Sequence, residues 1–438
     1  MMKNIDETGI NVKMRQAAYA VIGGCVVGIA AISVLDVAVS MGRFIPQSDI
    51  VSDYVTAFCW ALILGASIIF FPVSKKDKSG LLIVWFVKIV VTLGFMLIYE
   101  NNYYGLDSYN YFSRALNDSY DSTVAGFYGT QLVDNLVWLH LRVLPHSYHM
   151  LKVSFSFVGL ISVFIFYRAA IMFIQKENIR VFYILSFFPS ILFWSSILGK
   201  DPLIMLGISL CAYGLVAWHR KQSHRYLIVL LSGILFASIV RMWMAPILLA
   251  SLLVFILCGK YRFATKAFVF LAVAAILFFF VSKLQQVFLI ESLNDIISTT
   301  NDLSRRFATG NTGLTQQTYT SLNSMAIYAP VGMFTALFRP LPGEAMNLFG
   351  VFAGIENLFI LGLAIIAIKR SSFKDMKDPV IIWAIVTIIV WSVLYGFIAF
   401  NLGTTARFKA QILPILLALA LYQARNRKTI PVKIKKNP

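Results

Sequence analysis

The sequence has little charge for its length. Only 13% of its 438 residues are Asp, Glu, Lys or Arg, and 59% are hydrophobic. An ordinary soluble domain has about 25% charged and about 45–50% apolar residues. The low charge therefore excludes a soluble globular enzyme, a disordered chain, a collagen and a coiled coil. What the composition predicts is an all-α, polytopic transmembrane helical bundle.

Several motifs that carry chemistry are also absent. The four cysteines lie inside or at the edge of apolar runs, so we predict neither a disulfide nor a thiolate metal site. The chain has no Walker phosphate loop, no nucleophile elbow and no metal-ligand spacing. We therefore expect no metal, no cofactor and no ATP-driven pump. The net charge of +18 does not indicate nucleic acid, because cations of membrane proteins gather in cytoplasmic loops.

What the chain has instead is a series of apolar runs. A helix needs about 20 apolar residues to cross the hydrocarbon core, and we count about 12 such spans. They lie at residues 17–41, 54–73, 80–99, 148–172, 181–198, 202–218, 225–240, 242–258, 266–283, 350–368, 380–400 and 409–422. Segment 325–338 is apolar but short, and Pro330 interrupts it, so we interpret it as re-entrant or interfacial.

Basic residues predict the orientation of these spans. Most Lys and Arg residues fall in alternate loops, which places both termini in the cytoplasm of a bacterial inner membrane. Two long loops, 100–147 and about 284–349, then face the periplasm. We divide the chain into a nine-span bundle with the first loop (1–283), the second loop (284–349), and a three-span part with a basic tail (350–438).

Seven cations contradict the orientation bias, because they fall at the predicted outer face. Arginine presents a planar fork that binds phosphate through two hydrogen bonds, so this group suits a phosphate or pyrophosphate on a lipid. Each cation could instead reach lipid headgroups or pair with a nearby acid. The seven are Lys200, Arg241, Arg305, Arg306, Arg339, Arg407 and Lys409.

Acidic residues near the outer face are the candidates for catalysis. Asp107 lies among aromatic residues, including Tyr104 and Tyr111, which offer stacking faces for sugars. A carboxylate just outside the membrane can act as a general base on a hydroxyl. The alternative is an interfacial aromatic belt with a solvated aspartate. Asp201 could cap the helix that follows it, or line a cavity beside Asp107 together with Lys200.

Two further polar segments lie late in the chain. Arg339 to Glu344 contains two prolines and a glycine, and such irregular backbone at membrane depth is tolerated beside protein or a water-filled cavity. Segment 401–409 could hold an anion at the start of a helix, or form a plain turn. Inside the predicted spans, Asp36, Lys88 and Glu356 are interpreted as structural pairs.

Together these segments resemble bacterial polytopic proteins of surface-polysaccharide gene clusters. The resemblance is carried by the aromatic segment around Asp107, the Gly-Lys-Asp that ends at Asp201, Phe-Arg-Pro-Leu-Pro-Gly-Glu at 338–344, and Asn-Leu-Gly-Thr-Thr-Ala-Arg at 401–407. The pattern is similar to GT-C membrane glycosyltransferases and to the repeat-unit polymerases of O-antigen and capsule assembly. The Asp-Glu or Asp-x-Asp pair of many GT-C enzymes is absent.

The resemblance implies a GT-C-like fold and a glycosyltransferase that acts on polyprenyl-pyrophosphate-linked glycans. It implies a polyprenyl-linked saccharide and membrane lipid as partners, and a chain-length co-polymerase as a possible one. Asp107 would be the catalytic base, with Asp201 and Glu344 as further catalytic candidates. The substrate-binding candidates are Tyr104, Tyr111, Lys200, Arg241, Arg305, Arg339 and Arg407.

Three alternatives remain open. A polysaccharide flippase would carry charges through the membrane midplane and two similar halves. A single-sugar transferase would use a polyprenyl-phosphate sugar. A ligase or acyl-type transferase would use a histidine of an outer loop, for which His140, His146 and His149 are available.

Overall fold

The computed structural model describes residues 40–41, 45–47, 49–101, 106–117, 126–288, 292–308 and 312–425. These residues are helical apart from turns, loops and one isolated antiparallel bridge between Gly313 and Asn401. The predicted all-α class is therefore confirmed for the described part of the chain. The predicted span 17–41 lies almost wholly outside it.

Six helical segments are long and apolar enough to cross a membrane. They are Ile50–Phe70 (α2 and the short turn η1), Lys75–Asn101 (α3, η2 and α4), Tyr148–Ile174 (α7), Lys200–Lys221 (α10), Leu348–Arg370 (α16) and Pro379–Ile398 (α18). A seventh crossing is possible if the bent pair α19 (Leu402–Lys409) and α20 (Leu413–Ala424) counts as one span. Four shorter apolar helical segments are Arg225–Val240 (α11), Met244–Cys258 (α12), Val269–Phe278 within α13, and Leu322–Phe338 (α15).

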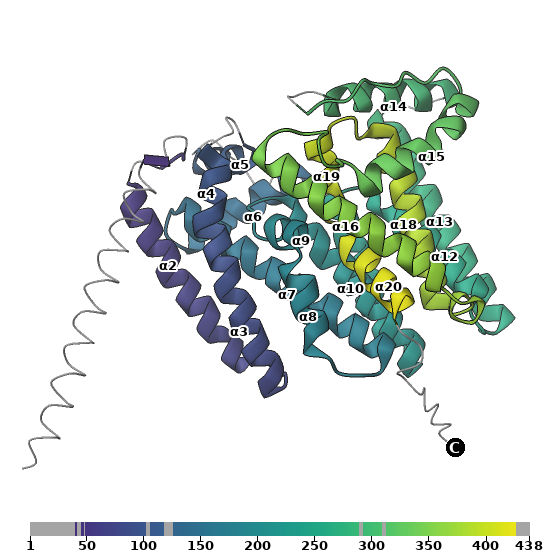
Figure 1. The fold of residues 1–438 in the computed structure, drawn as a ribbon, viewed down its shortest axis with the longest axis horizontal. Helices are drawn as coiled ribbons and strands as arrows, with labels where there is room; N and C mark the ends of the chain where they lie inside the picture. The colour runs from purple at the N-terminus through teal and green to yellow at the C-terminus, as the bar shows by residue number, and fades with distance from the viewer. Residues whose placement is uncertain are drawn as a thin grey trace, which may run out of the picture.

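The remaining helices are shorter or more polar. They are α5 (Asp107–Leu116), α6 (Thr130–Val143), α8 (Ile179–Phe187), α9 (Pro189–Trp194), α14 (Leu293–Phe307) and α17 (Phe373–Met376), while α13 extends over Phe263–Phe288. Helices α5, α14 and α19 lie at one end of the molecule, and the end of the described chain lies at the other (Figure 1).

The structure does not confirm 12 spans. The predicted span 181–198 is two short helices, α8 and α9, joined at an extended Phe188. Pro189 explains the break, because proline lacks an N–H and disfavours helical backbone at the preceding residue. The last predicted span, 409–422, corresponds to α20, and a bend of 68° at its start separates α20 from α19. Runs of apolar residues alone do not reveal such interruptions.

Helix α10 is the most enclosed of the candidate spans, with 78% of its apolar window buried. It packs between α7 and α11. A Cβ atom added at Gly207 would lie 2.7 Å from the backbone nitrogen of Ala237, so glycine permits the close approach of α10 and α11. Small residues serve this purpose between membrane helices. The tight packing fixes the position of Lys200 and Asp201 at the start of α10.

The segment between α15 and α16 turns beside the middle of α16. The Asn357 side chain donates a hydrogen bond to the Pro340 carbonyl at 2.8 Å, and a Cβ atom at Gly354 would lie 3.0 Å from the Pro342 nitrogen. Asn357 is nine residues into α16, or roughly 13 Å along the helix axis. The segment therefore contacts α16 about 13 Å from the start of this helix. It then runs back to Asn347, the N-cap of α16.

Candidate functional site

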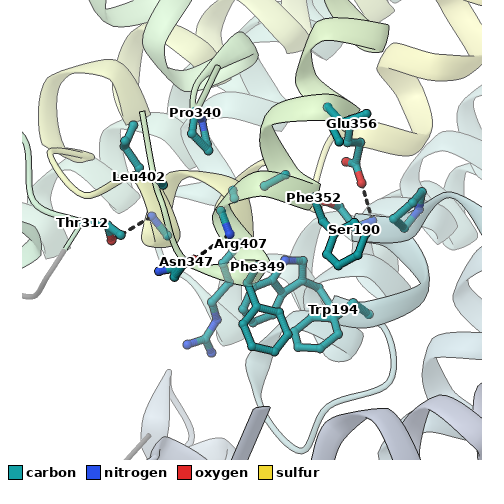
Figure 2. A pocket seen from close by; sticks show the side chains of 18 of the residues that line it. Ser190, Trp194, Thr312, Pro340, Asn347, Phe349, Phe352, Glu356, Leu402 and Arg407 are labelled. Atoms are coloured by element: carbon teal, nitrogen blue, oxygen red, sulfur yellow. Dashed lines mark hydrogen bonds between the residues drawn. The ribbon is translucent and has the colours of Figure 1, made fainter. Parts of the chain in front are cut away.

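A cavity of about 1060 Å³ lies between α9, α16, α19 and the end of the α3–α4 segment. Aromatic rings form much of its wall, with edge-to-face contacts such as Phe193–Trp194 and Tyr99–Phe349. Figure 2 shows Trp194, Phe349, Phe352 and Arg407 among the side chains that line it. The aromatic residues of the wall are Phe95, Tyr99, Phe188, Phe193, Trp194, Phe349, Phe352 and Phe359.

Arg407 joins this cavity to two carboxylates. Its Nε donates to Asp201 Oδ2 at 2.7 Å, and its Nη1 donates to Asp107 Oδ2 at 3.3 Å. The guanidinium carbon lies 5.5 Å from the centre of the Trp194 ring. The structure therefore brings together Asp107, Asp201 and Arg407, three residues that are more than 90 positions apart in the sequence.

The three residues differ in their exposure to solvent. The Asp107 side chain is 60% exposed, whereas that of Asp201 is 1% exposed. Asp201 does not cap α10 as the sequence allowed, because Gly199 is the N-cap and no side chain bonds to the first turn. Asp201 instead bonds Arg407 across 206 positions of the chain. Asp107 alone has the exposure that a group must have to reach a hydroxyl of a bound substrate.

The residues at the start of α19 explain why Arg407 lies beside the cavity. The Asn401 side chain caps α19 by accepting a hydrogen bond from the Thr404 amide at 3.0 Å. Thr312 holds the same Asn401 oxygen at 2.9 Å, and the Gly313 bridge ties the two segments together. Asparagine is among the preferred N-cap residues because its oxygen satisfies a free amide of the first turn. Segment 401–409 is thus a helix with an asparagine cap, and its Arg407 bonds the carboxylates of Asp107 and Asp201.

Lys200, Arg241 and Tyr111 lie around the same cluster. Lys200 Nζ donates to Thr130 Oγ1 at 2.8 Å. The Arg241 guanidinium lies 4.2 Å from the centre of the Phe408 ring. Burial and the nearby Asp107 raise the pKa of Tyr111, whose residue is 3% exposed. A buried ring offers no free face, so Tyr111 is not available to stack on a sugar in this conformation.

A second, smaller cavity of about 40 Å³ adjoins Asp107 and Arg407. Its wall includes Glu100 and Lys152, which form a buried ion pair of 2.7 Å. The Tyr148 hydroxyl donates to Glu100 at 2.8 Å and lies 3.0 Å from Ser108 Oγ, next to Asp107. Through Tyr148 and Ser108, the Glu100–Lys152 pair therefore supports the start of α5, which carries Asp107.

The other predicted site residues lie apart from this cluster. Arg339 and Glu344 form an ion pair of 2.7 Å within their own turn. Although partial burial opposes the shift, hydrogen bonds from Arg339 and the Leu341 amide lower the pKa of Glu344. Arg305 pairs with Asp302 at 3.6 Å on α14. Tyr104 lies outside the described residues.

The three histidines do not line either cavity. His149 is fully buried and bonds Asp53, and His140 Nε2 lies 2.9 Å from Ser154 Oγ. Burial lowers the pKa of His140 to about 4, so this side chain is neutral near pH 7. His146 is exposed. The histidine-based alternative therefore has no support from the position of these residues.

Ionisable residues inside the spans have different partners from those expected. Lys88 bonds Ser195 and Ser196 in the turn before α10, and Glu356 accepts a hydrogen bond of 2.8 Å from the Ser190 amide. Within the described part of the chain, neither bonds an oppositely charged residue, although Lys409 interacts electrostatically with Glu356. The interpretation as structural pairs is therefore wrong for Lys88, and Asp36 lies outside the described residues.

Sequence reasoning missed the aromatic cavity, Glu100 and Lys152. The cavity is built from segments around residues 95, 190, 350 and 405, which no local pattern connects. Glu100 and Lys152 each carried a usable signal, because a charge at the end of an apolar run is costly unless it is paired.

Among the described residues, no group of three or more His, Cys, Asp or Glu side chains is placed to hold a metal ion. No family model matches the chain, and neither a curated protein nor a solved structure matches it.

Proposed function

We propose that the chain is a bacterial inner-membrane glycosyltransferase of GT-C type that acts on polyprenyl-pyrophosphate-linked glycans. In this proposal it joins repeat units at the outer face of the membrane during assembly of O-antigen, capsule or exopolysaccharide. The observation that carries the proposal is one continuous arrangement: an aromatic cavity ends at Arg407, which holds the exposed Asp107. Such a site suits a substrate with an apolar chain and a polar head.

The cavity supports the lipid part of this substrate. Its volume of about 1060 Å³ lies at the upper end of the range for small-molecule pockets, and apolar residues dominate its wall. Phe352 and Phe359 line it and are 56% and 59% exposed on α16. Because these rings face outward on a candidate membrane span, the cavity opens toward the place that lipid would occupy. An isoprenoid chain could enter from the membrane without crossing water.

Asp107 supports the chemical step. As general base, it takes the proton of an acceptor hydroxyl while that oxygen forms a bond to the anomeric carbon of the donor sugar. The bond between this carbon and the pyrophosphate oxygen breaks, and polyprenyl pyrophosphate leaves with the electron pair. Asp201 is buried, so it acts as a positioning residue that orients Arg407. The Arg339–Glu344 pair has no part in the step.

Deletion of the gene, followed by analysis of the lipid-linked saccharides that accumulate, tests the proposal. Complete single repeat units together with loss of long polymer are expected for a polymerase. A unit that lacks one sugar would instead identify a single-sugar transferase. An unchanged glycan profile would contradict the whole proposal. Complementation with Asp107→Asn should reproduce the deletion, whereas Arg305→Gln, a variant of an exposed pair, should restore polymer.

A polysaccharide flippase is the second candidate, and buried charges in the spans favour it. Lys88, Glu356 and Lys409 are each at most 7% exposed, and Glu356 lines the aromatic cavity. Ionisable groups within membrane spans often mark a transport path. Complete units trapped on the cytoplasmic face of the membrane after deletion would decide for the flippase.

A further inference from the structure

Glu356 is a buried acid in the wall of the aromatic cavity, and the proposed transfer step gives it no role. Of the described residues that line this cavity, Glu356 is the only acid and Arg407 is the only base. Their partners differ, because Arg407 contacts two carboxylates, whereas Glu356 is 7% exposed and bonds a backbone amide. An ionisable residue inside a membrane span is costly to bury, so it is a candidate for a functional role.

Only one oxygen of the Glu356 carboxyl group is bonded within the described chain. Its Oε2 accepts a hydrogen bond of 2.8 Å from the Ser190 amide, a contact that Figure 2 shows at the cavity. Its Oε1 is buried and has no hydrogen-bond partner among the described residues. A buried polar atom without a partner costs free energy, and the cost is greater for a charged group. A ligand with a hydrogen-bond donor would remove this cost.

Lys409 is the cation nearest to Glu356 in electrostatic terms, yet it does not bond the free oxygen. Its Nζ bonds the Asn357 side chain, which in turn donates to the Pro340 carbonyl at 2.8 Å. Neither Lys409 nor Asn357 lines the cavity, whereas Glu356 does. Consecutive residues of a helix point in directions about 100° apart, so the Lys409–Asn357 contact lies behind the wall. Lys409 therefore leaves the cavity side of Glu356 without a partner.

Aromatic rings lie around Glu356 in this wall. Phe349, Phe352 and Phe359 recur with Glu356 at intervals of three or four residues, so the four side chains share one face of α16. Phe188 belongs to the segment that bonds Glu356, and its ring centre lies 6.3 Å from that of Phe359. The faces of aromatic rings carry partial negative charge and attract cations. The carboxylate and the rings therefore favour the same kind of ligand, an organic cation.

We infer that the cavity binds an amphipathic primary amine, whose ammonium group bonds Glu356 Oε1 and whose apolar body lies among the aromatic rings. An ammonium group supplies both positive charge and N–H donors. An isoprenoid chain has no donor and leaves Oε1 without a partner. A saccharide has donors, but the neighbours of Glu356 on α16 are apolar and leave its other hydroxyls unbonded. The inference goes beyond the proposed function and does not rest on it.

Binding of two probes with the same apolar body to the purified full-length protein in detergent tests the inference. Phenylbutylamine is protonated at neutral pH, whereas phenylbutanol is uncharged, and titration calorimetry measures both affinities. We expect the wild type to bind the amine at least about tenfold more tightly than the alcohol, because a charged hydrogen bond forms in a buried site. Glu356→Gln keeps an oxygen for the Ser190 amide but removes the charge, so it should abolish this preference. Glu344→Gln, an acid outside the cavity wall, is the matched control and should keep it.

Equal affinity of the wild type for the amine and the alcohol would overturn the inference, and this result needs no variant. A folded Glu356→Gln protein that keeps the preference for the amine would overturn the role of Glu356. If Glu356→Gln fails to fold, Phe352→Ala replaces it, because Phe352 lines the cavity and is 56% exposed. Phe352→Ala should weaken amine binding, and an unchanged affinity would place the amine outside the cavity.

The outcome separates this inference from the proposed function. If deletion of the gene abolishes polymer while the wild type binds both probes equally, the inference alone fails. If the preference for the amine depends on Glu356 while deletion leaves every glycan unchanged, the proposed function fails and the amine site stands.

Discussion

Two irregular turns flank the aromatic cavity, and different kinds of polar contact hold them. The turn between α9 and α10 is held from within by Lys88, which is 1% exposed and bonds Ser195 and Ser196 at 2.7–2.9 Å. The turn between α15 and α16 is held by Arg339 and Glu344, whose side chains are each about a quarter exposed. The second turn contributes Pro340, Ala345 and Asn347 to the cavity wall, and the first turn directly follows Trp194, which is also part of that wall.

The difference in burial decides what each contact contributes. If the Lys88 ammonium is removed, the buried Ser195 carbonyl loses its bond to Lys88, and the two serine hydroxyls keep only the bonds that they donate to the Leu192 carbonyl. A buried polar group that loses its partner costs about 1–3 kcal/mol. If the Arg339–Glu344 pair is broken, water replaces the lost partner, and exposed pairs contribute at most about 1 kcal/mol. The first turn therefore depends on one side chain, whereas the second depends on its prolines and on Asn357.

Lys88→Met should have the largest effect. We expect a loss of about 3 kcal/mol in the free energy of unfolding, because the substitution keeps the apolar stem and deletes the three hydrogen bonds. Unfolding of the purified protein in detergent measures the change. Lys76→Met, an exposed position on the same helix, is the control and should change stability by less than about 0.5 kcal/mol. Equal stability of the two variants would contradict the claim that the turn between α9 and α10 depends on Lys88.

Asp201→Asn and Asp107→Asn should have the next largest effects, of opposite kinds. Asp201 is buried, so its neutral variant should lose about 2 kcal/mol of stability, as expected for a hydrogen bond between charged groups. Asp107 is exposed, so its variant should keep its stability within about 1 kcal/mol. Complementation of the deletion strain should show that Asp107→Asn nonetheless restores no polymer. A fully active Asp107→Asn protein would contradict its role as base.

Arg339→Gln should have a smaller effect on stability than Asp201→Asn and a smaller effect on activity than Asp107→Asn. The expected loss is at most about 1 kcal/mol, because the pair is partly solvated. A double-mutant cycle with Glu344→Gln measures the coupling between the two side chains. A coupling energy above about 2 kcal/mol would show that the second turn depends on its ion pair as strongly as the first depends on Lys88.

Lowering the pH should have the smallest effect on stability. The pKa of Glu344 is lower in the folded protein, so the unfolded chain binds a proton more readily than the folded one. The contribution of this pair is therefore present above the ordinary glutamate pKa, and it is lost as the pH falls through the lowered value. Unfolding of the wild type and of Glu344→Gln between pH 7 and pH 3 should show a small additional loss in the wild type alone.

The sequence was sufficient for the helical class and for part of the site. Composition predicts a helical membrane protein, and cations and acids at unusual positions led to Asp107, Asp201 and Arg407, which the structure places in contact. The break at Phe188 was not predicted, because an apolar run and a broken run have the same hydropathy. Pro189 was visible and, given its effect on the preceding residue, could have indicated the break.

The partners of charged residues could not be predicted from the sequence, since they depend on tertiary packing. Arg407 meets Asp107 across 300 positions and Asp201 across 206. Arg339 has the same side chain and a similar predicted location, yet it meets an acid five positions away. Residue type thus identified the candidates, and packing determined which acid each arginine contacts.

Photo-cross-linking from the cavity wall tests the central claim most directly. A benzophenone amino acid replaces Phe352 in the cavity, and Phe334 on the exposed side of α15 as the control. After irradiation in cells, mass spectrometry identifies the attached lipid. The account predicts a polyprenyl-pyrophosphate-linked species at position 352 and ordinary phospholipid at position 334. The same phospholipids at both positions, with no isoprenoid at 352, would contradict it.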